Sequence, residues 1–254
     1  MESVDKNEHL LIGVQAMEQR KYDFAMDSLE KAAEMGCDEA FAQLGEAYIL
    51  GFAIRRDEDR ALAYFCKAAE AGNPKGMYWL GRMYAYGYSV KADAQKALDW
   101  WKKAADAGSS EAMIAIGDTY FLGTSEIDEA TGKRMVSLGN VHLQRSEDID
   151  KAEAWYTEAV EVGDDMTMRA LEKLYELLSH KAKNTVAGDK LRFDDRNLTN
   201  IDIAQAMEKL ADFYLAQDDY FENNDNHKAK RNYWLKKAAE NGSRHAKLLV
   251  SEPL

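Results

Sequence analysis

The sequence predicts an all-α fold, a right-handed α-solenoid superhelix of antiparallel helix pairs. Three observations predict it. A Lys-Ala-Ala phrase that ends in glycine recurs every 36 residues, at 31–36, 67–72 and 103–108. A Leu-Gly or Ile-Gly pair, with tyrosine three residues after the glycine, keeps step with that phrase. Between these marks the apolar residues fall at helical spacing, which is typical of stacked helical repeats.

Each repeat is interpreted as two helices, A and B. The small residue of the Leu-Gly pair in helix A lets helix B approach closely, and this defines the structural positions Gly45, Gly81 and Gly117. Helix B carries an apolar stripe with one recurring aromatic residue. We expect that residue to fill the space between the helices, at Tyr64, Trp100, Trp155 and Trp234.

The connections between helices carry turn chemistry. Glycine follows helix B, where a left-handed residue ends a helix at low cost. Asp57 and Asp93 are predicted to cap the B helices. Caps for the A helices are predicted at Asp38, Asn73 and either Ser109 or Ser110. The glycines predicted to be left-handed are Gly36, Gly72, Gly108, Gly163 and Gly242.

The repeats are regular in the first half of the chain and irregular in the second. Residues 1–125 hold units at about 6–39, 40–75 and 76–111 and the helix A of the next unit. Residues 126–254 hold weaker units that end in a capping helix at 243–250. Insertions are predicted near 124–146, 181–200 and 217–226.

Composition excludes several classes of protein. The chain has 33 Lys and Arg against 45 Asp and Glu, a net charge of −12 without a basic stripe, so nucleic acid is not an expected partner. Two cysteines cannot form a disulfide framework. No apolar stretch is long enough for membrane insertion, and the first residues show no secretory signal. We therefore expect a cytoplasmic protein.

Catalytic and metal-binding motifs are not evident. The histidines show no metal-ligand spacing, so neither a metal nor a cofactor is expected. A Ser-x-x-Lys motif at Ser28 and Lys31 falls on repeat positions and lacks the other motifs of penicillin-binding enzymes. The chain is therefore predicted not to be an enzyme. A hydrolase-type site at the irregular centre, around 132–142 or 181–200, is kept as an alternative.

The full pattern resembles the Sel-one-like repeat family, a longer-looped relative of the tetratricopeptide repeat. Residues 76–111 match it nearly throughout and 40–75 match well. The resemblance implies adaptor or scaffold roles based on protein–protein interaction. In bacteria it also implies cytosolic immunity proteins that bind and neutralise a toxin, which stays open as an alternative. A purely structural, self-assembling array is a third possibility.

The expected binding surface is the concave groove lined by the A helices. By analogy with tetratricopeptide units, its partner-binding positions include Glu46, Tyr78, Arg82, Asp118 and Phe121. Tyr78 and Arg82 lie one turn apart and belong to residue types that dominate interface energies. The partner is predicted to be a peptide or protein domain, basic if the acidic stretch 147–165 steers it.

Overall fold

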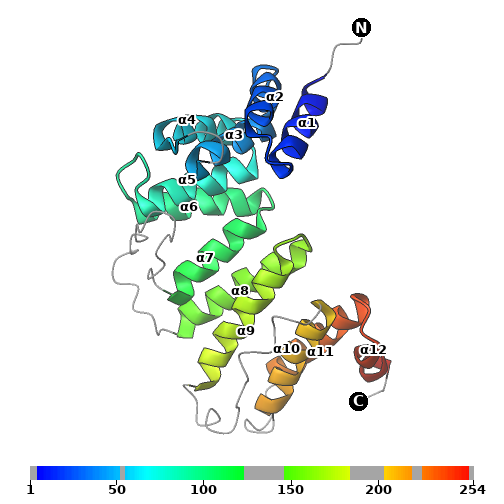
Figure 1. Cartoon of the computed structure of the whole chain (residues 1–254). Coiled ribbons are helices and arrows are strands. Elements are labelled where there is room, and N and C mark those ends of the chain that lie inside the picture. Colours follow the sequence, from blue (N-terminus) through cyan, green and yellow to red (C-terminus); the bar gives the residue numbers. More distant parts are fainter. Residues whose placement is uncertain (1–4, 52–54, 123–145, 184–202, 219–224, 252–254) are drawn as a thin grey trace. The chain divides into compact units, whose positions relative to one another are not determined.

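The structure is a computed structural model that describes residues 5–51, 55–122, 146–183, 203–218 and 225–251 (Figure 1). Every regular element in these residues is an α-helix. The chain divides into two compact units, Met1–Arg145 and Ser146–Leu254. The structure thus confirms the all-α fold of consecutive helix pairs.

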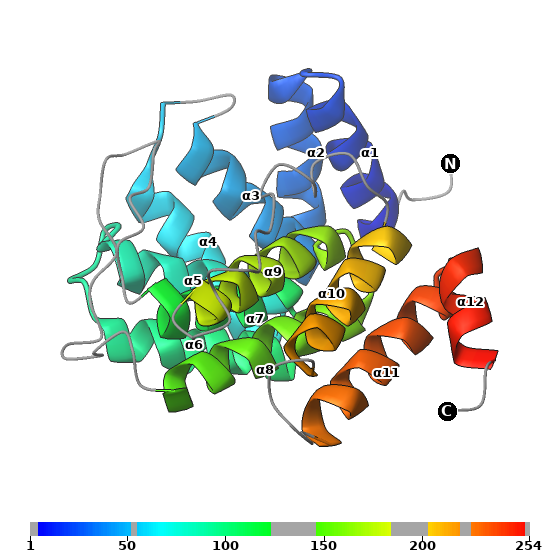
Figure 2. The same ribbon diagram turned by 90° about the horizontal axis from the view of Figure 1, so that it is seen from below.

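Where the structure describes unit 1, the chain forms three helix pairs and one further helix A. Each helix packs on the next along the chain, and short connections make the members of a pair antiparallel (Figures 1 and 2). The A helices α3 and α5 also contact each other. The helices are α1 (Lys6–Glu18), α2 (Tyr22–Glu34), α3 (Asp38–Leu50), α4 (Glu58–Glu70), α5 (Pro74–Tyr86), α6 (Ala94–Asp106) and α7 (Ser110–Leu122).

A glycine of helix A faces a large side chain of helix B in every complete pair of unit 1. A Cβ atom placed on Gly81 would lie 2.3 Å from the Trp101 ring, and one on Gly45 would lie 2.5 Å from Phe65. In the first pair a Cβ on Gly13 would lie 2.7 Å from the side chain of Leu29. No real Cβ tolerates such distances, so glycine sets the separation of the helices. The predicted role of Gly45 and Gly81 is confirmed, and Gly117 is buried in α7.

The predicted aromatic position of helix B is off by one residue in two pairs of unit 1. Trp101 is 3 % exposed and Phe65 fully buried, whereas Trp100 and Tyr64 are only partly buried. The ring at the centre of the stripe faces the partner helix, and its chain neighbour is rotated about 100° to the flank. Lys103 Nζ covers the Trp100 ring at 4.1 Å on that flank.

The helix ends follow the predicted turn chemistry. The five glycines after the B helices have φ between +74° and +104°. Asp57 accepts the Arg60 N–H at 3.0 Å, and Asp93 accepts the Lys96 N–H at the same distance. Capping side chains therefore satisfy N–H groups that the first helical turn leaves open.

The predicted caps of the A helices are confirmed at two places and wrong at one. Asn73 accepts the Gly76 N–H at 2.9 Å, and Ser109, rather than Ser110, accepts the Ala112 N–H at 3.2 Å. Asp38 is the first helical residue of α3, and the capping position belongs to Cys37, whose side chain makes no cap bond. In the first turn, the negative charge of Asp38 still interacts favourably with the positive end of the helix dipole.

The described residues of unit 2 form five helices. The closest pairs are α8 with α9 and α10 with α11, while α12 packs on α11 and α10 contacts α9. Trp155 is partly buried and Tyr156 beside it fully buried, but Trp234 fills the core as predicted. The predicted insertions fall mostly outside the described residues. The helices are α8 (Ser146–Val162), α9 (Thr167–Lys183), α10 (Ile203–Asp218), α11 (Asp225–Glu240) and α12 (Arg244–Ser251).

The close contact between Gly81 and the Trp101 ring predicts that a side chain added at position 81 destabilises the chain. Gly81→Ala should lower the free energy of unfolding by about 1–3 kcal/mol, because the methyl group overlaps the Trp101 ring. Urea denaturation measures the change. Combining it with Trp101→Leu should cost less than the two single changes added together, since the smaller side chain leaves room. Additive losses would show that the two residues do not share one space.

Candidate functional site

The predicted binding residues Tyr78 and Arg82 lie on α5, one helical turn apart. Asn73 caps the start of this helix, and Gly87, with φ +69°, ends it. Both Tyr78 and Arg82 are partly exposed. The backbone of Tyr78 also ties α5 to α6, because its carbonyl accepts the Nε1–H of the buried Trp101 at 3.1 Å.

Stacked rings hold the exposed side of α5 in place. The Trp79 ring stacks on Phe65 of α4 at 5.2 Å, and Tyr78 meets Trp79 edge-on at 6.0 Å. The Arg82 guanidinium lies 4.6 Å from the centre of Trp79 and 5.5 Å from that of Tyr86. Such contacts favour one position of a long, otherwise mobile side chain.

The run of rings continues into the loop after α5. Tyr86 stacks on Tyr88 at 5.5 Å, and the Arg56 guanidinium lies 5.0 Å above Tyr88. Ser89, at a left-handed φ of 53°, donates its N–H to Glu58 at 3.1 Å. These contacts hold the loop against the start of α4.

Charged residues join the A helices of neighbouring repeats. Lys75 Nζ lies 2.6 Å from Glu46 Oε2, and both side chains are about one-quarter exposed. The Asn73 side chain donates to Glu39 at 3.0 Å. Glu46 therefore already has a partner within the chain. We call the surface formed by Glu46, Lys75, Tyr78 and Arg82 the α5 face.

Two of the predicted binding residues are buried. Asp118 is 4 % exposed and Phe121 9 % exposed. The analogy with tetratricopeptide repeats placed both side chains on the surface, but in α7 they point into the core. The other three predicted binding residues, Glu46, Tyr78 and Arg82, are partly exposed.

A buried polar cluster in unit 2 was not predicted. Glu153 of α8, 5 % exposed, accepts the Tyr214 hydroxyl at 2.7 Å and pairs with Lys230 of α11. Burial, and then the carboxylate charge, raise the pKa of Tyr214 above its usual range. Counted from the repeat glycine, Glu153 stands where the regular repeat has the buried Leu98, and that exchange was the available signal.

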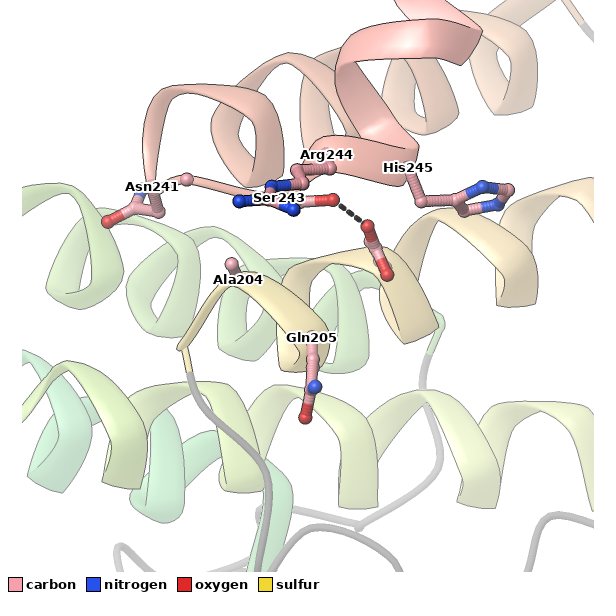
Figure 3. A pocket seen from close by; sticks show the side chains of 8 residues that line it. Ala204, Gln205, Asn241, Ser243, Arg244 and His245 are labelled. Carbon is pink, nitrogen blue, oxygen red and sulfur yellow. Dashed lines mark hydrogen bonds between the residues drawn. The ribbon is translucent and has the colours of Figure 1, made fainter.

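An open pocket of about 390 Å³ lies where the start of α12 meets α10 (Figure 3). Ser243 caps α12, because its hydroxyl oxygen accepts the Ala246 N–H at 2.9 Å. The Ser243 hydroxyl donates to Glu208, which also accepts the Ala246 N–H at 3.3 Å. Partial desolvation, and then the charge of Glu208, raise the pKa of Asp212, one helical turn further along α10. The sequence pattern gave no signal for this pocket. Its lining is Ala204, Gln205, Glu208, Asn241, Gly242, Ser243, Arg244 and His245.

The Ser-x-x-Lys motif forms no site. The buried Ser28 hydroxyl donates to the Phe24 carbonyl at 2.9 Å, and Lys31 pairs with Asp27 at 3.3 Å. Cys66 is a free thiol whose pKa is raised, first by burial and then by Glu70. The residues around 132–142 and most of 181–200, the alternative hydrolase site, lie outside the described residues.

In the part of the chain that the structure describes, no three His, Cys, Asp or Glu side chains are grouped so that they could hold a metal ion. None of the described helices is both long enough and apolar enough to cross a membrane.

The signature of the Sel1 repeat matches residues 39–73, 74–109, 137–164 and 204–243, more than half of the chain. The chain belongs to the Sel1-repeat family. The first two matches span the α3–α4 and α5–α6 pairs, so these two helix pairs are Sel1 repeats. Sel1-repeat proteins are generally protein-interaction modules. A comparison with curated proteins found no match.

Solved structures with the same fold include two bacterial Sel1-type proteins. A protective antigen of uropathogenic Escherichia coli with an SLR fold is 22 % identical at a TM-score of 0.54, over 98 % of this chain. This chain spans 49 % of the antigen's length. A Sel1 repeat protein of Oxalobacter formigenes is 22 % identical at a TM-score of 0.52, over 94 % of this chain and 88 % of that one. At this identity the likeness shows the fold alone.

The polar cluster of Glu153, Tyr214 and Lys230 in unit 2 predicts a loss of stability when one member is removed. Lys230→Met should destabilise α10 by ~2 kcal/mol, less than a fully buried pair because Lys230 is one-third exposed. Adding Glu153→Leu and Tyr214→Phe should recover much of the loss, since no buried polar group is then left unpaired. Native-state hydrogen exchange of α10 measures both.

The control for this prediction is Lys31→Met, which removes a surface pair with Asp27, and its cost is measured by hydrogen exchange of α2. That change should cost less than about 1 kcal/mol. If Lys230→Met costs no more than this control, the buried cluster contributes nothing to stability.

Proposed function

We propose that this Sel1-repeat chain is a non-enzymatic protein-interaction module that binds a partner peptide or domain on the α5 face. The observation that supports it is a partly exposed tyrosine and arginine, Tyr78 and Arg82, held on a scaffold of buried stacked rings. The family supports the same class of function, because Sel1 repeats generally mediate protein interactions.

Rigidity is the physical reason to prefer this surface. A side chain that is already ordered loses less conformational entropy when a partner binds. Arg82 is held by Trp79 and Tyr86, and Tyr78 by its ring contact with Trp79. Tyrosine and arginine are also the residues most often found to dominate the energy of an interface.

The proposal predicts the loss of a captured partner in one variant. Tyr78→Ala combined with Arg82→Glu should lose a partner that the wild type retains in affinity capture from the source cell's lysate, followed by mass spectrometry. The matched control is Trp100→Ala with Lys103→Glu, which removes an aromatic–cation pair from α6. The control should retain the partner. Circular dichroism checks that both variants fold.

A partner kept by both variants would move the site away from the α5 face. A partner lost from both would indicate damage to the scaffold rather than to a site. The identity of the captured protein separates the adaptor from the toxin inhibitor, since only the inhibitor would retain a toxin.

A further inference from the structure

Arg82 differs from Arg56 and Arg60, the other arginines of unit 1 that lie over rings, in the groups that surround its guanidinium N–H donors. A guanidinium that lies on an aromatic ring uses its face, and its five N–H donors point outward in the plane. The edge then needs a hydrogen-bond acceptor from the chain, from water or from a ligand. The geometry of that edge fits the two oxygens of a carboxylate.

Two arginines of the same unit combine a ring contact with an ion pair. Arg56 lies over Tyr88, and its Nη2 is 3.3 Å from Glu58 Oε1, although its buried Nε and Nη2 make no hydrogen bond. Arg60 lies over Tyr48, and its Nε is 3.4 Å from Asp57 Oδ2. In both, a ring lies against the guanidinium and a carboxylate of the chain lies within ion-pair distance of it.

Arg82 contacts two aromatic rings but no carboxylate of the described residues. It lies against both Trp79 and Tyr86, yet within the part of the chain that the structure describes its guanidinium makes neither an ion pair nor a hydrogen bond. It is partly exposed, so its edge is open to a ligand. Glu46, on the neighbouring helix A, is engaged by Lys75.

We propose that a bound partner completes Arg82 with an Asp or Glu side chain, so that the α5 face recognises an acidic peptide segment. This inference rests on the proposed function and names the chemistry of its partner. The apolar part of the segment packs on Tyr78, and its carboxylate forms a two-pronged contact with the Arg82 edge. Arginine is required there because lysine has neither the planar fork nor the stacking face.

The acidic segment differs from the basic partner that the acidic stretch 147–165 led us to expect. Such steering acts at long range and is screened beyond about 8 Å at physiological salt. A direct contact with one stacked guanidinium is shorter than that. The local chemistry of Arg82 therefore decides which group binds there.

A random peptide library displayed on phage tests the inference with the full chain as bait. The peptides are fused through their C-terminal ends, so only side chains supply carboxylates. Peptides whose binding depends on Tyr78 should be enriched in Asp or Glu. In fluorescence anisotropy with a selected peptide, Arg82→Lys should weaken binding roughly tenfold, while Arg60→Lys should leave it unchanged.

A second measurement ties the loss to the carboxylate. Replacing the peptide's acidic residue by its amide should weaken binding to the wild type by a similar factor and should hardly affect binding to Arg82→Lys. Peptides that depend on Tyr78 but tolerate Arg82→Lys, or carry no required acidic residue, would overturn the inference and leave the proposed function standing. A library without any peptide that depends on Tyr78 would overturn both.

Discussion

The close approach of a helix A glycine to a helix B ring is the contact on which unit 1 depends. Gly81 admits the Trp101 ring, and Gly45 admits Phe65, at distances that no side chain on the glycine would allow. This contact sets both the separation and the rotation of each helix pair. Because the positions of the helices decide where their outward side chains lie, the surface of unit 1 depends on this glycine–ring contact.

The same rings connect one repeat to the next. Phe65 belongs to α4 and stacks on Trp79 of α5, so the residue that closes one pair also positions the following helix A. Trp101 in turn donates its ring N–H to the Tyr78 carbonyl. The exposed Arg82 rests on Trp79, so its position follows from the core beneath it. Trp79, which packs in the core, and Tyr78, a candidate binding residue, are therefore neighbours in the chain with different roles.

Local and periodic features of the fold could be predicted from the sequence. The caps at Asp57, Asp93 and Asn73 and the left-handed glycines involve residues only a few positions apart, and their patterns repeat. The ring at the centre of helix B could not be chosen reliably. Trp100 and Trp101 are adjacent and both aromatic, and only the rotation of the helix against its partner separates them.

Contacts between distant residues, and the burial that results from them, escaped prediction. Glu153 meets Tyr214 and Lys230 across 61 and 77 residues of chain, a separation that no periodic pattern encodes. Asp118 and Phe121 occupy surface positions by analogy but are buried, because burial depends on which elements surround a helix. Sequence reasoning placed Tyr78 and Arg82 on one helix face, but the open edge of Arg82 became visible only from its contacts.

The central claim is that the α5 face is where a partner binds. Hydrogen–deuterium exchange of the full chain, with and without the captured partner, tests it most directly. The account predicts that partner binding slows exchange in α5 and the adjacent α3, with little change in α6 or in the described helices of unit 2. Slower exchange confined to α8 or to α11 and α12, with α5 unchanged, would contradict the account.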